Sequence, residues 1–223
     1  MALNVTNCVE RIIFAAITQK TMKKKLVFVT NNAHKIGEVR SLLDNLGQGL
    51  SEHYEICSLA DIGCSDDIPE TADTFSGNAF QKARYVQEHY GYDCFADDSG
   101  LEVFALDMAP GVRSARYASE EGHDSEANIR KLMANMEGVS DRRARFRTVI
   151  ALLIDGEAHE FEGICEGEIT CERAGVGGFG YDPVFRPAGY DLTFAEMSSE
   201  EKNSISHRGR AVKSLVEWLG AKC

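Results

Sequence analysis

The sequence lacks the signatures of several protein classes. Its seven cysteines are odd in number and never stand in C-x-x-C spacing, so neither a disulfide framework nor a zinc site is predicted. No two histidines have the helical i, i+4 spacing, and no apolar run reaches the roughly 18 residues of a membrane span. We therefore expect reduced thiols, a cytoplasmic location and no contact with a membrane.

Positive charge is also scarce. Lys and Arg number 24 against 35 Asp and Glu, which gives the 223 residues a formal net charge of −11. This balance excludes a protein that holds long nucleic acid through many phosphate contacts, because such binding needs a basic face. A small phosphorylated substrate stays possible, since a few cations and a metal ion reverse the charge of a single pocket.

The first 21 residues look different from the rest of the chain. They lack the basic start and the small-residue cleavage site of a secretory signal. Met22 is followed by three lysines and an apolar strand, as at the natural start of a fold. We expect residues 1–21 to be an extension outside the fold and residues 22–223 to form one domain. The alternative for residues 1–21 is a helix that caps the fold.

Hydrophobic periodicity predicts alternating strands and helices. The β-branched run Lys25–Thr30 predicts a buried strand, and the polar loop Asn31–His34 leads into a helix at Lys35–Leu46. An α/β fold is therefore expected. The other predicted strands are Tyr54–Leu59, Cys94–Asp97, Leu101–Leu106, Arg143–Ile154, and a strand that begins with Glu157–Phe161 and continues beyond it. The other predicted helices are Asp73–Tyr90, one from Asp124 or Ser125 to Gly138, and one that Ser206 caps.

The loop after the first strand is rich in polar residues. In open α/β sheets, ligands bind beyond the carboxyl ends of the strands. Free N–H groups at the start of the following helix, together with Lys35, favour an anion there. The glycines and the G-K-[ST] ending of a P-loop are absent. The alternative is an ordinary polar turn with a solvated lysine.

Two adjacent carboxylates, Asp97 and Asp98, follow an apolar strand. Burying them is costly unless they bind a cation or hydrogen-bond donors. Neighbouring strand residues point to opposite faces, so we expect the two to have different roles. Their oxygens suit Mg²⁺, and Glu70 is a candidate for a further carboxylate ligand. The alternatives are an acidic turn and an exposed loop acid.

The third motif combines glycines and aromatic residues. Gly175, Gly177 and Gly180 satisfy G-x-G-x-x-G, but Pro183 and the Val-Phe pair after it indicate a strand instead of the helix of a dinucleotide site. Glycines beside Phe179 and Tyr181 favour close approach to a flat ligand such as a base. An aromatic turn of the core is the alternative.

Cations follow further along the chain. Lys202, His207 and Arg208 lie near the start of the last predicted helix, where Ser206 is the expected cap. Arginine matches phosphate with two hydrogen bonds, while lysine acts as a point charge. We expect an anion site here, although a solvated charged face is the common explanation of such a run.

The combination of motifs resembles a known family. The segments VTNNAHKIGEV, FADDSGLEVFAL, PGVRSARYA, GGFGYDPVF and EMSSEEKNSISHRGRA occur in family order between about Lys24 and Gly220. They are similar to the non-canonical purine nucleoside triphosphate pyrophosphatases, also called inosine triphosphate pyrophosphatases. This resemblance implies a long mixed central sheet flanked by helices, two lobes with the active-site cleft between them, and a homodimer. It also implies Mg²⁺-dependent hydrolysis of ITP, dITP or XTP to the monophosphate and pyrophosphate, which cleanses the nucleotide pool.

The resemblance also implies roles for single residues. Asp98 is the implied proton acceptor and magnesium ligand, and Glu70 is a further metal ligand. The implied substrate-binding residues are Thr30, Asn31, Asn32, Ala33, His34 and Lys35 at the triphosphate, Ser99, the base and sugar wall Phe179, Gly180, Tyr181 and Asp182, and Lys202, His207 and Arg208 at base or phosphate.

Two other functions stay open. The first is a pyrophosphatase of other modified nucleotides, such as modified pyrimidines. The second is a nucleotide-binding module without catalysis. The presence of both Asp98 and Lys35 argues against the second alternative.

Overall fold

The computed structural model describes residues 23–47, 49–119 and 124–223, so the predicted extension 1–21 lies outside the described residues. Within these ranges, no helix combines the length and the apolar character needed to cross a membrane. The strands are β1 Lys24–Phe28, β2 Tyr54–Cys57, β3 Cys94–Val103, β4 Arg143–Ile154, β5 Glu157–Ile169 and β6 Phe185–Pro187. The α-helices are α2 Ala33–Leu46, α3 Leu50–His53, α4 Phe75–Tyr90, α5 Ser125–Asn135, α6 Ser199–Ile205 and α7 His207–Gly220. The 3₁₀ helices are η1 Ala60–Ile62, η2 Phe104–Leu106, η3 Gly111–Arg116 and η4 Asp182–Val184.

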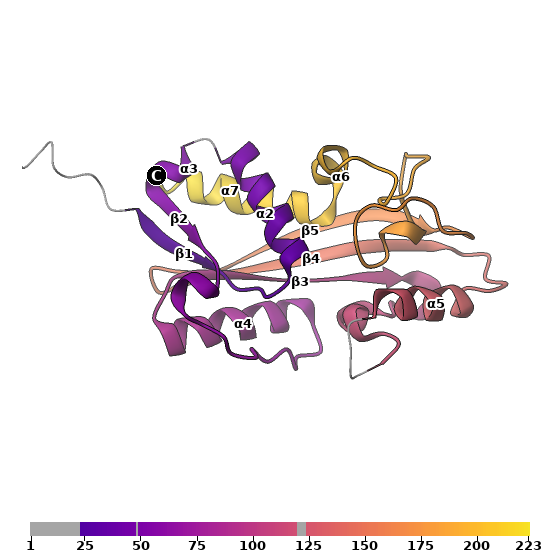
Figure 1. Ribbon diagram of the computed structural model, residues 1–223, viewed down its shortest axis with the longest axis horizontal. Helices are drawn as coiled ribbons and strands as arrows, with labels where there is room; N and C mark the ends of the chain where they lie inside the picture. The colour runs from indigo at the N-terminus through magenta and orange to yellow at the C-terminus, as the bar shows by residue number, and fades with distance from the viewer. Residues whose placement is uncertain (1–22, 48, 120–123) are drawn as a thin grey trace, which may run out of the picture.

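A mixed sheet of six strands forms the centre of the molecule, in the order β2-β1-β3-β4-β5-β6. β1 pairs in parallel with β2 and β3, and the remaining pairs are antiparallel. Helices α2 and α7 lie over one face of the sheet, and α4 and α5 lie along the other (Figure 1). The expected α/β fold with a long mixed sheet flanked by helices is confirmed.

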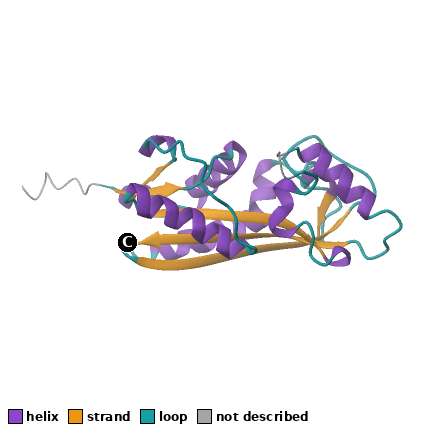
Figure 2. Cartoon of the chain, turned by 90° about the horizontal axis from the view of Figure 1, so that it is seen from below, coloured by secondary structure: helices purple, strands orange, loops and turns teal. Residues whose placement is uncertain are grey.

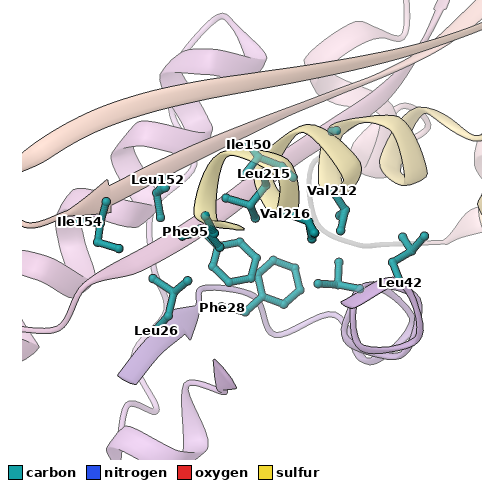
Figure 3. Packing of buried hydrophobic residues seen from close by; sticks show 13 residues of the cluster. Leu26, Phe28, Leu42, Phe95, Ile150, Leu152, Ile154, Val212, Leu215 and Val216 are labelled. Atoms are coloured by element: carbon teal, nitrogen blue, oxygen red, sulfur yellow. The ribbon is translucent and has the colours of Figure 1, made fainter. Parts of the chain in front are cut away.

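The hydrophobic core has parts at both ends of the long strands. On the α2 and α7 side, Phe28 stacks on Phe95 with 4.7 Å between ring centroids, and Leu215 packs in the same cluster (Figure 3). Val86 of α4 belongs to a cluster on the opposite face, and Phe185 belongs to a third near β6 and α5. The molecule has two lobes, one around α2, α4 and α7 and the other around α5 (Figures 1 and 2). Both lobes share one sheet, because the long strands run most of the length of the molecule.

The most important difference from the expected elements concerns β3. Two short strands were predicted, separated by a turn at Asp98, Ser99 and Gly100, and this prediction is wrong. All three residues pair with β4, and the strand continues without a break from Cys94 to Val103. Gly100 lets the backbone of η3 lie directly against the strand, because a Cβ atom there would overlap the Gly111 carbonyl oxygen. The two aspartates therefore lie in the middle of a strand.

Capping residues decide where the helices begin. Thr74, Asp124 and Ser206 each accept a hydrogen bond from a backbone N–H of the helix that follows. The sequence predicts Ser206 as a cap, but it leaves the choice open between Asp73 and Thr74 and between Asp124 and Ser125. The first helix begins two residues earlier than predicted, at Ala33, because Asn32 is its cap. Helix α6 was not predicted, and the strand predicted to continue beyond Phe161 is β5, which ends at Ile169.

Helix α7 lies very close to β5 at Gly163. A Cβ atom there would overlap the carbonyl oxygen of His207 and crowd the backbone nitrogen of Ala211. The missing side chain thus brings the first turn of α7 down onto the sheet.

We expect Gly163→Ala to lower the free energy of unfolding by about 1–3 kcal/mol, because α7 must move away from the sheet. Gly37→Ala is the matched control, since Gly37 lies within α2 and no heavy atom surrounds the site of its Cβ within 4 Å. That control should be neutral or raise stability by up to about 1 kcal/mol. Urea unfolding measures both, and equal stability of the two variants would contradict the packing described.

Candidate active site

A cavity of about 660 Å³ lies between the two lobes. This volume is in the range of about 300–1,000 Å³ that is usual for small-molecule sites. Its walls come from the β1–α2 connection, the segment before α4, β3, η3, the glycine-rich loop before η4, and the α6–α7 corner. The structure brings most of the predicted site residues to this cavity: Thr30, Asn31, Asn32, Lys35, Glu70, Asp98, Ser99, Phe179, Gly180, Tyr181, Asp182, Lys202, His207 and Arg208.

Ala33 and His34 are the predicted site residues that do not line the cavity. The side chain of Asn32 accepts hydrogen bonds from the backbone N–H groups of His34, at 3.0 Å, and Lys35, at 3.2 Å. The expectation of free N–H groups at the helix start is therefore wrong for these two residues. The His34 ring instead stacks on Phe179, with 5.2 Å between centroids, and so contacts the glycine-rich loop.

Asp98 lies on the α4 side of β3. Its Oδ2 accepts a hydrogen bond from Asn78 Nδ2 at 3.0 Å, and its Oδ1 accepts one from the Ser99 backbone N–H at 2.9 Å. Burial raises the pKa of Asp98 above its ordinary value, although Lys82 and Lys35 act in the opposite direction. The carboxylate is therefore more basic than that of an exposed aspartate.

Asp97 points to the opposite face, as the alternation along a strand predicts. Its carboxylate is only 1% exposed and pairs with Lys35 Nζ at 3.2 Å and Arg208 Nε at 3.3 Å. Burial alone would raise the pKa of Asp97, but Lys35 and Arg208 hold it well below the usual range. Asp97 therefore stays charged and fixes the position of two cations.

Glu38 extends this network and was missed by the sequence reasoning. One carboxylate oxygen accepts a hydrogen bond from Lys202 Nζ at 2.8 Å, and the other pairs with Arg208. Lys202 also contacts Asp182 Oδ2 at 2.7 Å. A signal did exist, because Glu38 stands one turn before the apolar Leu42 within the helix predicted at Lys35–Leu46.

Asp182 shapes the glycine-rich loop from within. Its Oδ2 accepts a hydrogen bond from the Phe179 backbone N–H at 2.8 Å. Gly178 has a φ of 69° and leaves room for this carboxylate, which a Cβ atom would overlap. Tyr181 anchors the same loop by donating a hydrogen bond of 2.9 Å to the Ser114 carbonyl oxygen. Phe179 is thereby presented to the cavity by a fixed backbone.

Two carboxylates on the cavity wall are candidates for a divalent metal. Asp98 and Glu70 both line the cavity, and Lys82 Nζ lies 2.5 Å from Glu70 Oε1. Across the described ranges, no three His, Cys, Asp or Glu side chains form a ready metal cluster. Mg²⁺ commonly takes one or two carboxylates and completes its ligands with water and substrate phosphates. The oxygen donors of Asp98 and Glu70 fit such an ion.

The charges around the cavity are close to balanced. Each cation of the network contacts a carboxylate, and Asp98 adds one more negative charge. The paired side chains therefore do not give the cavity the strong positive charge that unpaired cations would give it. The cations of the network are Lys35, Lys82, Lys202 and Arg208, and the carboxylates are Glu38, Glu70, Asp97, Asp98 and Asp182. Arg116 and Asp67 also line the cavity, one of each sign.

His207 lies beneath these charges and is 4% exposed. Its ring stacks on Phe146 with 4.7 Å between centroids, and its Nδ1 has no hydrogen-bond partner among the described residues. Burial, with Arg208 and Lys202 adding to the effect, holds the pKa of His207 well below 6.5. The imidazole is therefore neutral in the folded protein.

We expect His207 to make stability fall as the pH drops below about 6.5, because only the unfolded chain then takes up a proton at this residue. Relative to His207→Phe, the wild type should lose at most about 1.4 kcal/mol per pH unit. Chemical unfolding between pH 7.5 and 5.5 measures this difference. A His207→Phe curve parallel to that of the wild type would show that His207 takes up its proton equally in the folded and unfolded states.

Comparison with known proteins gives close relatives along nearly the whole chain. A dITP/XTP pyrophosphatase of Christiangramia forsetii is 54% identical over 195 residues, which cover 87% of this chain and 98% of the relative. A protein of the same name from Porphyromonas gingivalis is 54% identical over 197 residues, or 88% of this chain and 97% of the relative.

Solved structures agree with these relatives. The Ham1 protein of Staphylococcus aureus is 37% identical, superposes with a TM-score of 0.79, and covers 90% of this chain and 100% of its own. A nucleoside-triphosphatase, also titled dITP/XTP pyrophosphatase, from Mycobacterium abscessus is 39% identical with a TM-score of 0.69, and covers 86% of this chain and 98% of its own. The model of the Ham1 family matches residues 26–218, and the chain belongs to this family.

Proposed function

We propose that this chain hydrolyses the non-canonical purine nucleoside triphosphates dITP, XTP and ITP to the monophosphate and pyrophosphate. The observation that carries the proposal is the buried, basic carboxylate of Asp98 in a cavity that also holds lysines, arginines and the aromatic ring of Phe179. Relatives that are about half identical to this chain are named dITP/XTP pyrophosphatases. Removal of such nucleotides cleanses the pool from which polymerases draw.

Asp98 is proposed as the proton acceptor for the attacking water. Burial raises its pKa, which makes it a stronger base than an exposed aspartate. The Asn78 amide and the Ser99 N–H hold the carboxylate in one orientation. Such positioning matters because a base acts only within hydrogen-bond reach of the proton that it removes.

The metal is proposed to be Mg²⁺, held by Asp98 and Glu70. When bound, a divalent cation neutralises phosphate charge and polarises the phosphoryl oxygen. Lys82 sets the position of Glu70 through their ion pair and also donates a hydrogen bond of 2.7 Å to the Asp97 carbonyl oxygen. Lys82 thus joins the Glu70 segment to the strand that carries Asp98.

The remaining cations are proposed to bind the phosphates. Lys35 reaches the cavity from the start of α2, beside the polar side chains of Thr30, Asn31 and Asn32. Lys202 and Arg208 come from the α6–α7 corner and are fixed in place by Glu38. Preorganised cations of this kind stabilise the charge of a phosphoryl-transfer transition state without reorganising during the reaction.

The base is proposed to contact Phe179 and His207. A neutral imidazole has no charge with which to attract phosphate, so His207, which lines the cavity, is placed at the base and not at a phosphate. A 6-oxo purine presents an acceptor and a ring N–H where adenine presents an amine. A pocket built for the first edge leaves buried groups unpaired with the second, and such mismatches reach about 10⁴-fold.

Pyrophosphate release from a panel of nucleotides tests the proposal. With Mg²⁺, kcat/KM for dITP and XTP should exceed that for dATP by about 10²-fold or more. GTP and dUTP belong in the panel, because faster turnover of a pyrimidine would favour a pyrophosphatase of other modified nucleotides. If no nucleotide in the panel yields pyrophosphate, the result would favour a nucleotide-binding module without catalysis.

Asp98→Asn should lower kcat for dITP by about 10²–10⁴-fold, because the amide accepts no proton from water. Asn keeps the size of the side chain, so the variant should fold and still bind dITP. Asp155→Asn, in the exposed β4–β5 turn, is the matched control and should keep wild-type turnover. Near-normal kcat in Asp98→Asn would remove Asp98 from the role proposed for it.

Two further parts of the proposal concern the state of the protein in the cell. We propose that it forms a homodimer, as the resemblance to its family implies, and its mass in solution decides this. We also propose that it works in the cytoplasm, where the nucleotide pool lies. In support, the six cysteines of the described ranges are free thiols, which fits a reducing compartment.

A further inference from the structure

One arginine of the cavity wall stands outside the ion-pair network. Arg116 is the last residue of η3 and lines the cavity in a half-buried position. Its Nη2 donates a hydrogen bond of 3.3 Å to the backbone carbonyl oxygen of Glu70. No carboxylate in the described ranges lies within ion-pair distance of its guanidinium, whereas Lys35, Lys82, Lys202 and Arg208 each have one.

The backbone that carries Arg116 is firmly held. Ser114 Oγ accepts a hydrogen bond from the Leu101 backbone N–H of β3 at 2.8 Å. The Ser114 carbonyl oxygen accepts hydrogen bonds from the Tyr181 hydroxyl, at 2.9 Å, and the Asn128 side chain, at 3.4 Å. η3 is thus tied to the sheet, to the glycine-rich loop and to α5, so the base of the Arg116 side chain has a fixed place beside the cavity.

Arg116 lies near Glu70 on the wall of the cavity. Burial raises the pKa of Glu70, but Lys82, Lys35 and Arg116 together bring it below its ordinary value. The guanidinium is therefore close enough to act on the proposed metal ligand. Arg116, Glu70 and Asp98 line the same cavity.

The charge balance around the cavity distinguishes Arg116 from the paired cations. The paired cations are already neutralised by Glu38, Glu70, Asp97 and Asp182, so they add little net attraction for a highly charged anion. A guanidinium with a single long bond to a carbonyl oxygen keeps most of its donors for a ligand, and its fork matches two phosphate oxygens.

We infer that Arg116 binds the phosphate chain of the substrate. The inference rests on the proposed function, because it names a further residue of the same site. The competing explanation is that Arg116 only fixes the Glu70 segment through its hydrogen bond to the backbone.

Binding of inorganic tripolyphosphate to the full chain, with Mg²⁺ present, separates the two explanations. Arg116→Gln should weaken this binding by about ten- to a hundredfold, the usual effect of a hydrogen bond to a charged group. Arg116→Lys should recover much of the loss, since it restores the charge. Deoxyinosine, which has no phosphate, should bind all three proteins within about twofold of each other. Isothermal titration measures these affinities without any need for turnover.

The control is Arg113→Gln, which removes the same charge from the same 3₁₀ helix at an exposed position away from the cavity. It should bind tripolyphosphate like the wild type. The inference is overturned if Arg116→Gln keeps wild-type affinity, if the Lys and Gln variants are equally weak, or if the wild type does not bind tripolyphosphate. Failure of the wild type to release pyrophosphate from dITP, with tripolyphosphate binding still dependent on Arg116, would sink the proposed function alone.

Discussion

The buried ion pairs around Asp97 are the interaction on which the rest of the structure depends. Asp97 lies in the middle of the central sheet and holds Lys35 of α2 and Arg208 of α7, while Glu38 joins Arg208 to Lys202 of α6. A buried charge without its partner costs several kcal/mol, so the three helices are stable only when they meet at this point. The network therefore places the corner of the cavity as well as the helices.

The same network changes the meaning of the overall charge of −11. An acidic protein that handles triphosphates invites the expectation of one strongly positive cleft. The structure instead fixes each cation of the network with an internal carboxylate, and Asp98 adds a further negative charge. Attraction of an anionic substrate then depends on a metal ion and on any cation outside the network.

The continuous strand β3 explains why two adjacent aspartates have such different surroundings. Alternation along the strand sends Asp97 among the cations of α2 and α7 and sends Asp98 toward α4 and the cavity. Burial dominates at Asp98, where it raises the pKa, and ion pairs dominate at Asp97, where they lower it. One strand thus supplies a structural anion and a basic carboxylate from neighbouring positions.

The sequence by itself determined the α/β class, the cap Ser206 and most of the residues that meet at the cavity, because periodicity, capping and motif chemistry are local properties. Only the tertiary structure decided that β3 is unbroken, that Asn32 occupies N–H groups expected to be free, and that His34 stacks on Phe179. It also decided the partner of Lys202, since Glu38 stands 164 residues away along the chain. Such pairs depend on how the helices pack, and no local pattern encodes that distance.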